Sequence, residues 1–243
     1  MSEITFKRKF YDEMLEWKKN SNGKSALMID GARRVGKSTI AEEFAKNEYD
    51  DYLLIDFVNA SKDIKDNFDN LGNMDVFFRN LFLFAGKGLK SSNSVIIFDE
   101  VQECPEALNS LKYFCEKAME YHIISAGSLL GTLLAQPKSY PVGKVNIMNI
   151  YPLMFDEFLC AVDDGLFSYY ESLSKGSQIE NIFHNRLLEA YKYYLIIGGM
   201  PECVASWSKE KDAAKVLKIQ HELQELYEND FTKHNRKVNS GRI

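Results

Sequence analysis

The sequence has few cysteines, and they lie far apart. They form no C-x-x-C pair, and no histidine lies at metal-ligand spacing from them. This spacing argues against a structural zinc site and against a disulfide framework. We therefore expect reduced thiols in a cytoplasmic protein. The four cysteines are Cys104, Cys115, Cys160 and Cys203.

Long hydrophobic runs and an excess of basic residues are also missing. Apolar stretches such as VFFRNLFLFAG and SVIIF are shorter or more interrupted than the ~20 residues that span a bilayer. The amino terminus lacks the apolar segment of a signal peptide. Lysine and arginine total 30 against 35 aspartates and glutamates, and the net charge of -5 does not favour nucleic acid. We expect neither membrane binding nor DNA binding by this segment.

What is present in roughly the first 150 residues is an alternation of strand and helix patterns. Short runs of apolar and β-branched residues predict strands, and apolar residues at helical spacing separate most of these runs. The alternation predicts an α/β fold with a mainly parallel sheet. The expected strands cover 25–30, 52–57, 94–100, 122–127 and 144–150. The expected helices cover 5–19, 37–47, 74–85 and 106–119.

From residue 152 onward the pattern is helical, with hardly any strand signal. Apolar spacing predicts helices over 178–197 and 209–230, and the GGMPE stretch at 198–202 predicts a stop between them. A second interpretation of GGMPE stays open. Its glycines can bring the backbone close to a nucleotide or to a neighbouring subunit.

The stretch GARRVGKST fits the P-loop pattern G-x-x-x-x-G-K-[ST], between an expected strand and an expected helix. Its glycines let backbone N–H groups surround phosphates, and the helix N-terminus behind them favours anions. In this context Lys37 reaches the β- and γ-phosphates and the Ser38 hydroxyl ligates Mg²⁺. The alternative is a glycine turn that binds nothing. The predicted ATP-binding residues are Gly31, Ala32, Arg33, Arg34, Val35, Gly36, Lys37, Ser38 and Thr39.

A second motif, SVIIFDE, is an apolar strand that ends in two acids. Asp99, at the carboxyl end of the strand, can hold Mg²⁺ together with Ser38. Glu100 can orient or deprotonate the water that attacks the γ-phosphate. A second acid suits hydrolysis better than transfer to a bulky acceptor. The alternative is a pair of solvated acids at a strand end.

A third and weaker signal is the serine after HIISAG. The Ser128 hydroxyl can hydrogen-bond the γ-phosphate or the attacking water, and so sense which nucleotide is bound. Local hydrogen bonding within a turn is the alternative. The candidate catalytic residues are therefore Lys37, Glu100 and Ser128.

These motifs resemble those of prokaryotic AAA-type P-loop ATPases, in which the nucleotide-binding half is followed by a C-terminal domain of unknown function. The matching stretches run in order along nearly the whole chain: FKRKFYDEMLEWKK, GARRVGKST, DEVQ, SAGSLL, YPVGKVNIMNIYPLMFDEFL, GGMPE and YENDFTK. The resemblance implies an AAA/ASCE-type three-layer α/β sandwich with a parallel five-stranded sheet in the order 5-1-4-3-2, plus a C-terminal helical lid. It implies ATP and Mg²⁺ as ligands, residues 1–158 as the ATPase core and residues 159–243 as the lid. Relatives continue beyond YENDFTK into a further domain.

The sequence does not mark the arginine that completes the ATP site in many such enzymes, from the same chain or from a neighbour. YPVGKV carries a lysine where relatives commonly have arginine, so an arginine-specific contact is not expected there. The candidates are Arg79, Lys144, Arg186 and Arg236.

The expected function is Mg²⁺-dependent ATP binding and hydrolysis, with the nucleotide state coupled to a conformational change. One alternative is an ATP-gated interaction module with little hydrolysis, because no arginine finger is marked. Another is the ATPase half of a DNA-associated protein, which would depend on a further domain. The helical half is also a candidate surface for self-association or for a protein partner.

Overall fold

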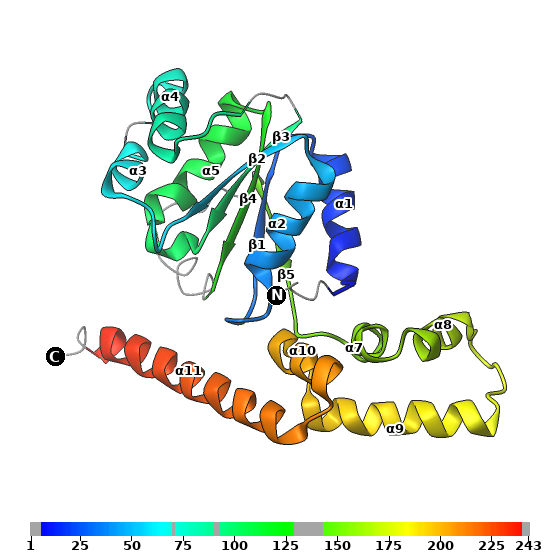
Figure 1. The fold of residues 1–243 in the computed structure, drawn as a ribbon. Helices are drawn as coiled ribbons and strands as arrows, with labels where there is room; N and C mark the ends of the chain where they lie inside the picture. The colour runs from blue at the N-terminus through cyan, green and yellow to red at the C-terminus, as the bar shows by residue number, and fades with distance from the viewer. Residues whose placement is uncertain (1–5, 70, 90–92, 129–142, 240–243) are drawn as a thin grey trace. The chain divides into compact units, whose positions relative to one another are not determined.

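The computed structural model describes residues 6–69, 71–89, 93–128 and 143–239, with side chains up to residue 230. The chain forms two compact units (Figure 1). The first unit is Lys9–Tyr151, and the second combines Pro152–Ile243 with Met1–Arg8.

The first unit is built on a five-stranded sheet in which each strand runs parallel to its neighbours. The strand order is β2-β3-β4-β1-β5, which confirms the predicted order 5-1-4-3-2. The strands are β1 (Ala26–Asp30), β2 (Asp51–Asp56), β3 (Ser94–Asp99), β4 (Tyr121–Gly127) and β5 (Val145–Asn149). Their bounds agree closely with the five predicted ranges, because apolar runs bounded by polar residues mark strand ends well.

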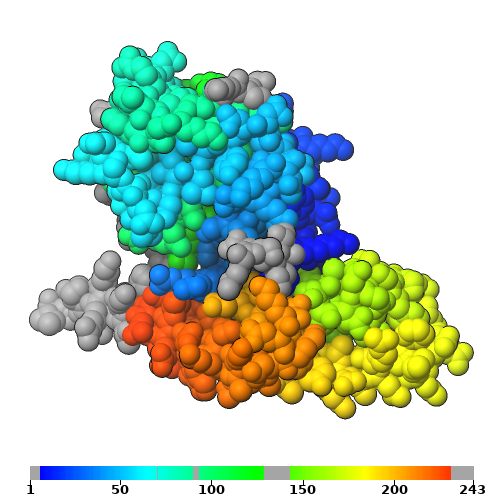
Figure 2. Space-filling view, in the orientation of Figure 1, coloured from blue at the N-terminus to red at the C-terminus, as the bar shows by residue number. Residues whose placement is uncertain are grey.

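Helices cover both faces of this sheet, so the first unit has three layers (Figure 1). Alternate residues of β1 show the two faces: Leu27 and Ile29 share a core with α1 and α2, whereas Met28 shares a core with α3, α4 and α5. In Figure 2 the cyan surface of α3 and α4 and the blue surface of α1 and α2 lie on opposite sides of the first unit. These helices are α1 (Lys9–Ser21), α2 (Lys37–Glu48), α3 (Lys62–Asn67), α4 (Met74–Ala85) and α5 (Pro105–Lys117).

The strand β3 lies inside the sheet and is buried along its whole length. Its sequence SVIIFD has no polar alternation because helices cover both of its faces. This burial carries the terminal Asp99 into the molecule, although an aspartate is rarely buried.

Two helices of the first unit differ from the prediction. Helix α3 has only six residues, too few to show apolar periodicity, although Ser61 caps it by accepting a hydrogen bond from the Ile64 N–H at 3.3 Å. Helix α1 begins at Lys9 rather than near residue 5. The residues just before it belong to the second unit, where Phe6 packs against the core.

Helices joined by loops make up the described residues of the second unit, without strands. Its core contains Phe158, Val204, Trp207 and Val216. The predicted helix over 209–230 begins later, because α10 ends first and the chain turns between the two helices. The helices are α7 (Phe155–Val162), α8 (Asp164–Ser172), α9 (Asn181–Ile197), α10 (Pro201–Glu210) and α11 (Ala213–Asn239).

A buried ion pair ties the start of the chain to this helical unit. Arg8 Nε lies 3.4 Å from Glu157 Oε1, and both side chains are buried. The other carboxylate oxygen of Glu157 accepts a hydrogen bond from the Met154 N–H at 2.9 Å, which caps the start of α7.

The GGMPE stretch acts as the predicted helix stop, since α9 ends before it and α10 begins at Pro201. A Cβ at Gly199 would lie 2.2 Å from the Leu153 carbonyl oxygen, and the Leu153 N–H donates to the Gly199 carbonyl at 2.7 Å. Gly199 is therefore required for a close approach of two backbone segments within the second unit.

The sequence predicts no membrane-spanning helix and reduced cysteines, and the structure bears on both predictions. Among the helices that the structure describes, none combines the length and the apolar character needed to cross a membrane. The four cysteines are free thiols, and Cys104, Cys115 and Cys203 are buried.

Candidate functional site

The loop between β1 and α2 lies at the carboxyl edge of the sheet and depends on its two glycines. Gly36 has a φ of 97°, in the left-handed region that glycine adopts without strain. A Cβ at Gly31 would lie 2.4 Å from the Ile150 carbonyl oxygen, just after β5. The close approach that requires Gly31 is thus to the chain's own backbone, a reason that the motif alone does not reveal.

The N-terminus of α2 carries no side-chain cap, unlike the N-termini of α3 and α4. Ser61 and Asn73 accept hydrogen bonds from first-turn N–H groups in those two helices. Within the described part of the chain the first turn of α2 has no such side-chain cap, and the helix dipole adds positive potential at the same point. This helix end can therefore receive an anion.

Lys37, the first residue of α2, turns back into the loop. Its Nζ donates hydrogen bonds to the carbonyls of Gly31 at 3.0 Å and Ala32 at 2.9 Å. Burial lowers the pKa of the ammonium group, while the carboxylates of Glu100, Asp30 and Asp99 oppose that shift. The lysine is thus a desolvated cation that a phosphate would stabilise.

Asp99 lies across from the start of α2, at the end of β3. Burial raises the pKa of its carboxyl group, against hydrogen bonds from the Ser38 hydroxyl and the Glu100 N–H that lower it. The Glu100 N–H lies 3.0 Å from Asp99 Oδ1. The site therefore brings the carboxylate and the hydroxyl of two predicted metal ligands, Asp99 and Ser38, into contact.

Glu100 follows Asp99 with a backbone that non-glycine residues rarely adopt. Its φ of 50° and ψ of 45° are left-handed, and the 3-10 helix η1 (Val101–Glu103) begins directly after it. The side chain accepts a hydrogen bond from Gln102. Its carboxylate has the largest effect of any charge on Lys37, so the two groups lie close together. Such backbone strain often accompanies functional sites.

Ser128 lies at the same edge of the sheet. It follows Gly127, which pairs with Asp30 at the end of β1, and β4 lies between β1 and β3. Its side chain is buried. The strand order therefore sets Ser128 between the loop and the two acids, as the sequence predicts for this type of sheet.

Comparison with known families agrees with this geometry. The sequence model of the AAA domain matches residues 23–159, which is more than half of the 243-residue chain. The chain belongs to the family of AAA domains. A second model, described as a domain of unknown function (DUF8612), matches residues 188–243 of this AAA protein. Together the two matches confirm the predicted family. No curated protein matches the sequence.

Solved structures similar to this AAA protein are remote in sequence. PCH-2 of C. elegans is 12% identical with a TM-score of 0.48, covering 87% of this chain and 65% of its own. The Aeropyrum pernix ORC1 protein, solved in complex with DNA, is 10% identical with a TM-score of 0.45, covering 91% and 66%. A Pyrococcus horikoshii signal transduction ATPase with numerous domains is 17% identical with a TM-score of 0.43, covering 82% and 29%. The chain thus spans less than two thirds of the length of these proteins.

The donor set of this AAA domain fits a nucleotide with Mg²⁺. Mg²⁺ prefers hard oxygen ligands, which the Asp99 carboxylate and the Ser38 hydroxyl supply. A bound dication would also stabilise the charged form of Asp99, whose burial otherwise disfavours it. The desolvated Lys37 and the uncapped start of α2 fit phosphate oxygens in the same way.

The other predicted ATP-binding residues of this loop differ in how exposed their side chains are. Arg33, Arg34 and Thr39 are exposed. The Val35 side chain is fully buried in the core beneath α2, so this residue offers only its backbone to a ligand.

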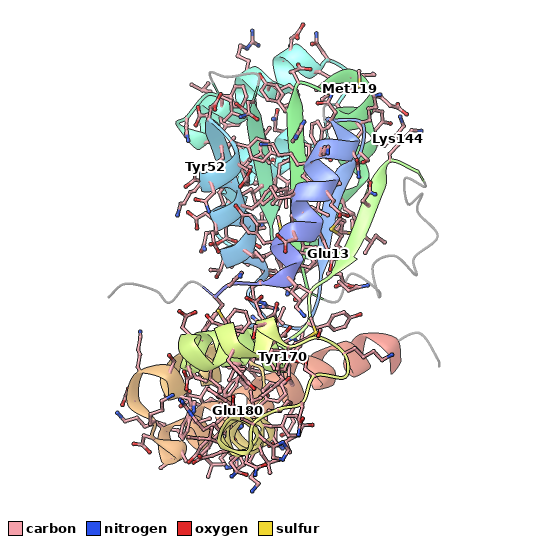
Figure 3. All side chains as sticks on the ribbon, turned by 90° about the vertical axis from the view of Figure 1, so that its right-hand side faces the viewer. Glu13, Tyr52, Met119, Lys144, Tyr170 and Glu180 are labelled. Atoms are coloured by element: carbon pink, nitrogen blue, oxygen red, sulfur yellow. The ribbon has the colours of Figure 1, made fainter. Side chains whose placement is uncertain are left out.

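The predicted arginine-finger candidates do not converge on the site. Lys144 precedes β5 at the opposite, amino edge of the sheet, where its carbonyl oxygen accepts a hydrogen bond from the Ala26 N–H at 3.0 Å. Figure 3 shows Lys144 at the same end of the first unit as Met119. Lys144 therefore cannot contact a phosphate bound at the loop of its own chain. Arg79 is exposed on α4, Arg186 pairs with Asp163 at 2.7 Å in the second unit, and the Arg236 side chain lies outside the described residues.

Two further acids occupy this edge, and the sequence prediction missed them. The first three strands all end in aspartate: Asp30, Asp56 and Asp99. Asp30 accepts from the Gly31 N–H at 2.8 Å, and Asp56 accepts from the Val58 N–H at 2.9 Å. The repeated aspartate at strand ends is the signal that could have found them.

Proposed function

We propose that this AAA domain binds ATP with Mg²⁺ and hydrolyses it. The observation that carries the proposal is the convergence of Lys37, the contacting Ser38 and Asp99, and Glu100 at one edge of the sheet. These groups come from α2 and from the end of β3, which the sequence separates by about 60 residues. A phosphate-binding loop alone does not require acids of this kind opposite it.

ATP binding would use the backbone of the loop and the start of α2. The unpaired N–H groups of the first helical turn would donate to phosphate oxygens, and the Lys37 ammonium would exchange the Gly31 and Ala32 carbonyls for the β- and γ-phosphates. Ser38 and Asp99 would hold Mg²⁺. The bound ion would supply positive charge that neutralises the phosphate oxygens as the terminal bond breaks.

Hydrolysis would use Glu100 as the group that orients water and accepts its proton. The water oxygen forms a bond to the γ-phosphorus, and the bond from that phosphorus to the β–γ bridging oxygen breaks, releasing ADP and phosphate. The Ser128 hydroxyl, buried at the same edge, would contact the γ-phosphate or the water and distinguish ATP from ADP. Lys37, Glu100 and Ser128 are the proposed catalytic residues.

The proposed division of labour follows the chain. Residues 1–158 would form the ATPase core and residues 159–243 a helical lid, whose conformation would follow the nucleotide state. The family match supports nucleotide binding by the core, and the proposal of lid movement rests on the division of the chain into two compact units.

The deciding experiment is steady-state ATP hydrolysis with Mg²⁺, measured beside ATP binding, for the wild type, Lys37→Ala and Glu100→Gln. We expect Lys37→Ala to lose binding, and Glu100→Gln to bind ATP but turn over at least ~100-fold more slowly. Matched controls are Lys46→Ala, an exposed lysine on the same helix, and Glu103→Gln, an exposed acid in η1. Both controls should keep wild-type turnover.

A different result would favour the second candidate, an ATP-gated interaction module. If ATP binds tightly, turnover is negligible and Glu100→Gln leaves turnover unchanged, the proposal that this segment hydrolyses ATP is wrong. The placement of Lys144, and the ion pair that Arg186 forms with Asp163, favour a site completed by a neighbouring subunit or partner in that case.

A further inference from the structure

Gln102 makes an unusual pair of contacts beside the proposed catalytic acid. Its Nε2 donates a hydrogen bond to Glu100 Oε2. Its other amide atom, Oε1, is buried and has no hydrogen-bond partner among the described residues. The opposite orientation of the amide would place its oxygen, which cannot donate, against the Glu100 carboxylate. The contact with Glu100 therefore leaves Oε1 as the amide atom without a partner.

Folding alone does not account for a glutamine at this position. Buried polar atoms in proteins are almost always paired, and an unpaired one destabilises the folded state. A methionine of similar length would fill the same space without an unpaired oxygen. The polar chemistry of Gln102 is therefore directed at Glu100 rather than at packing.

Glu100 needs such a partner because its own backbone and side chain leave it poorly defined. Its left-handed backbone turns the chain sharply into η1, and a glutamate side chain has three rotatable bonds. A general base has to lie within hydrogen-bond reach of the proton that it accepts. The hydrogen bond from the Gln102 amide engages Oε2 of Glu100 and does not involve Oε1.

We propose that Gln102 is a positioning residue for Glu100, which orients the carboxylate toward the attacking water through its side-chain amide. The inference rests on the proposed hydrolysis of ATP. It assigns Gln102 no contact with nucleotide, since Oε1 is buried and Nε2 is engaged by Glu100. Gln102 therefore affects the rate of the chemical step and not the binding of ATP.

The test is a double-mutant cycle between Gln102→Met and Glu100→Gln on the full chain. We measure kcat, KM and, separately, the Kd for ATP, together with the thermal midpoint of each variant. Gln102→Met should lower kcat about tenfold while KM and Kd stay within about twofold. Its thermal midpoint should not fall, because the unpaired oxygen is removed. In the Glu100→Gln background the same substitution should change turnover less than about twofold.

The matched control is Gln224→Met. Gln224 also donates to a glutamate, with Nε2 3.0 Å from Glu228 Oε1, but on the exposed surface of α11. It should leave kcat, KM and Kd unchanged. A general effect of losing a glutamine–glutamate contact would appear in this variant as well.

The outcomes separate this inference from the proposed function. If Glu100→Gln stalls but Gln102→Met turns over like the wild type, the positioning role fails and hydrolysis stands. Equal losses from Gln102→Met in both backgrounds, or a matching loss of ATP affinity, would show that Gln102 acts independently of Glu100 and also overturn the inference. A wild type that binds ATP without turnover overturns both proposals.

Discussion

The two edges of the same parallel sheet are built from different chemistry. The carboxyl edge gathers charges that are costly to bury, Lys37 and Asp99, together with the left-handed backbone of Glu100. The amino edge gathers aromatic contacts around a neutral histidine. The molecule stabilises its fold at the amino edge and gives up stability at the carboxyl edge.

At the amino edge, aromatic rings surround His122, although the buried Trp17 Nε1 has no hydrogen-bond partner among the described residues. Tyr49 Oη lies 2.7 Å from His122 Nδ1, and the rings of Trp17 and Tyr49 meet the imidazole edge-on at 5.9 and 5.4 Å. Burial, with a smaller effect from the Lys18 charge, lowers the pKa of His122 and keeps it neutral. Such packing stabilises the folded state directly.

At the carboxyl edge, the same sheet holds groups whose protonation equilibria burial opposes. Burial lowers the pKa of Lys37 and raises that of Asp99, so folding works against the charged form of each. Preorganised charges of this kind serve ligands rather than stability. Substitutions at the two edges should therefore separate activity from stability.

The largest effect should come from the amino edge. Trp17 is 3% exposed, and Trp17→Ala would leave a large cavity beside His122. We expect the free energy of unfolding to fall by about 3–5 kcal/mol, as for other buried aromatic truncations. Urea unfolding measures the loss, and ATPase assays on the remaining folded protein should give an unchanged kcat. If fully folded Trp17→Ala had a changed kcat, the two edges would not separate activity from stability.

The next effect should come from Asp99→Asn at the carboxyl edge. We expect turnover with Mg²⁺ to fall about 100-fold, since the proposed metal ligand loses its charge. Thermal stability should not fall, because burial opposes the charge of Asp99. Asp56→Asn is the matched control, because Asp56 pairs with Asp99 in the sheet but accepts hydrogen bonds from its own turn. Equal losses of turnover in both variants would contradict the assignment.

A smaller effect tests the backbone strain after Asp99. Glu100→Gly should raise the free energy of unfolding by up to about 1 kcal/mol, because glycine adopts left-handed angles without strain. The same variant should lose turnover. Glu103→Gly, within η1, should instead lower stability. Thermal unfolding of the pair gives the sign, and destabilisation by both would show that Glu100 stores no strain.

The smallest effect is a pH dependence at the amino edge. The folded pKa of His122 lies below its ordinary 6.5, so the unfolded chain binds more protons as pH falls past that value. Stability from this group is complete above about pH 6.5 and is lost as pH drops toward the folded pKa. The wild type should therefore lose more thermal stability between pH 7.5 and 5.5 than His122→Gln does. Parallel pH profiles would exclude this role of His122.

Local sequence patterns predicted most of the helices and strands. The apolar runs of β1 to β5 are bounded by turns and polar residues, and the family motifs supplied the order in which they pair. The patterns failed where local signals were weak or where distant contacts intervened. Helix α3 is too short for periodicity, and α1 starts late because Phe6 belongs to the second unit and packs on its helical core.

The sequence offered candidate site residues but not the contacts between them. GARRVGKST and SVIIFDE identify Lys37, Ser38, Asp99 and Glu100 as candidates from the types of residue and their spacing. Gln102 lies in the matching stretch DEVQ, but no role was predicted for it, because its contact with Glu100 exists only once η1 turns its amide onto that residue.

The sequence by itself determined the elements, the glycine-rich loop and the pair of acids at the end of β3, because these depend on neighbours within a few residues along the chain. Only the tertiary structure decided what those groups meet. The pairing of β4 between β1 and β3 set Ser128 at the loop's edge, and the packing of Ile150 made Gly31 indispensable. The burial of Lys37 and Asp99 likewise arises from segments distant in sequence, since desolvation depends on everything packed around a charge.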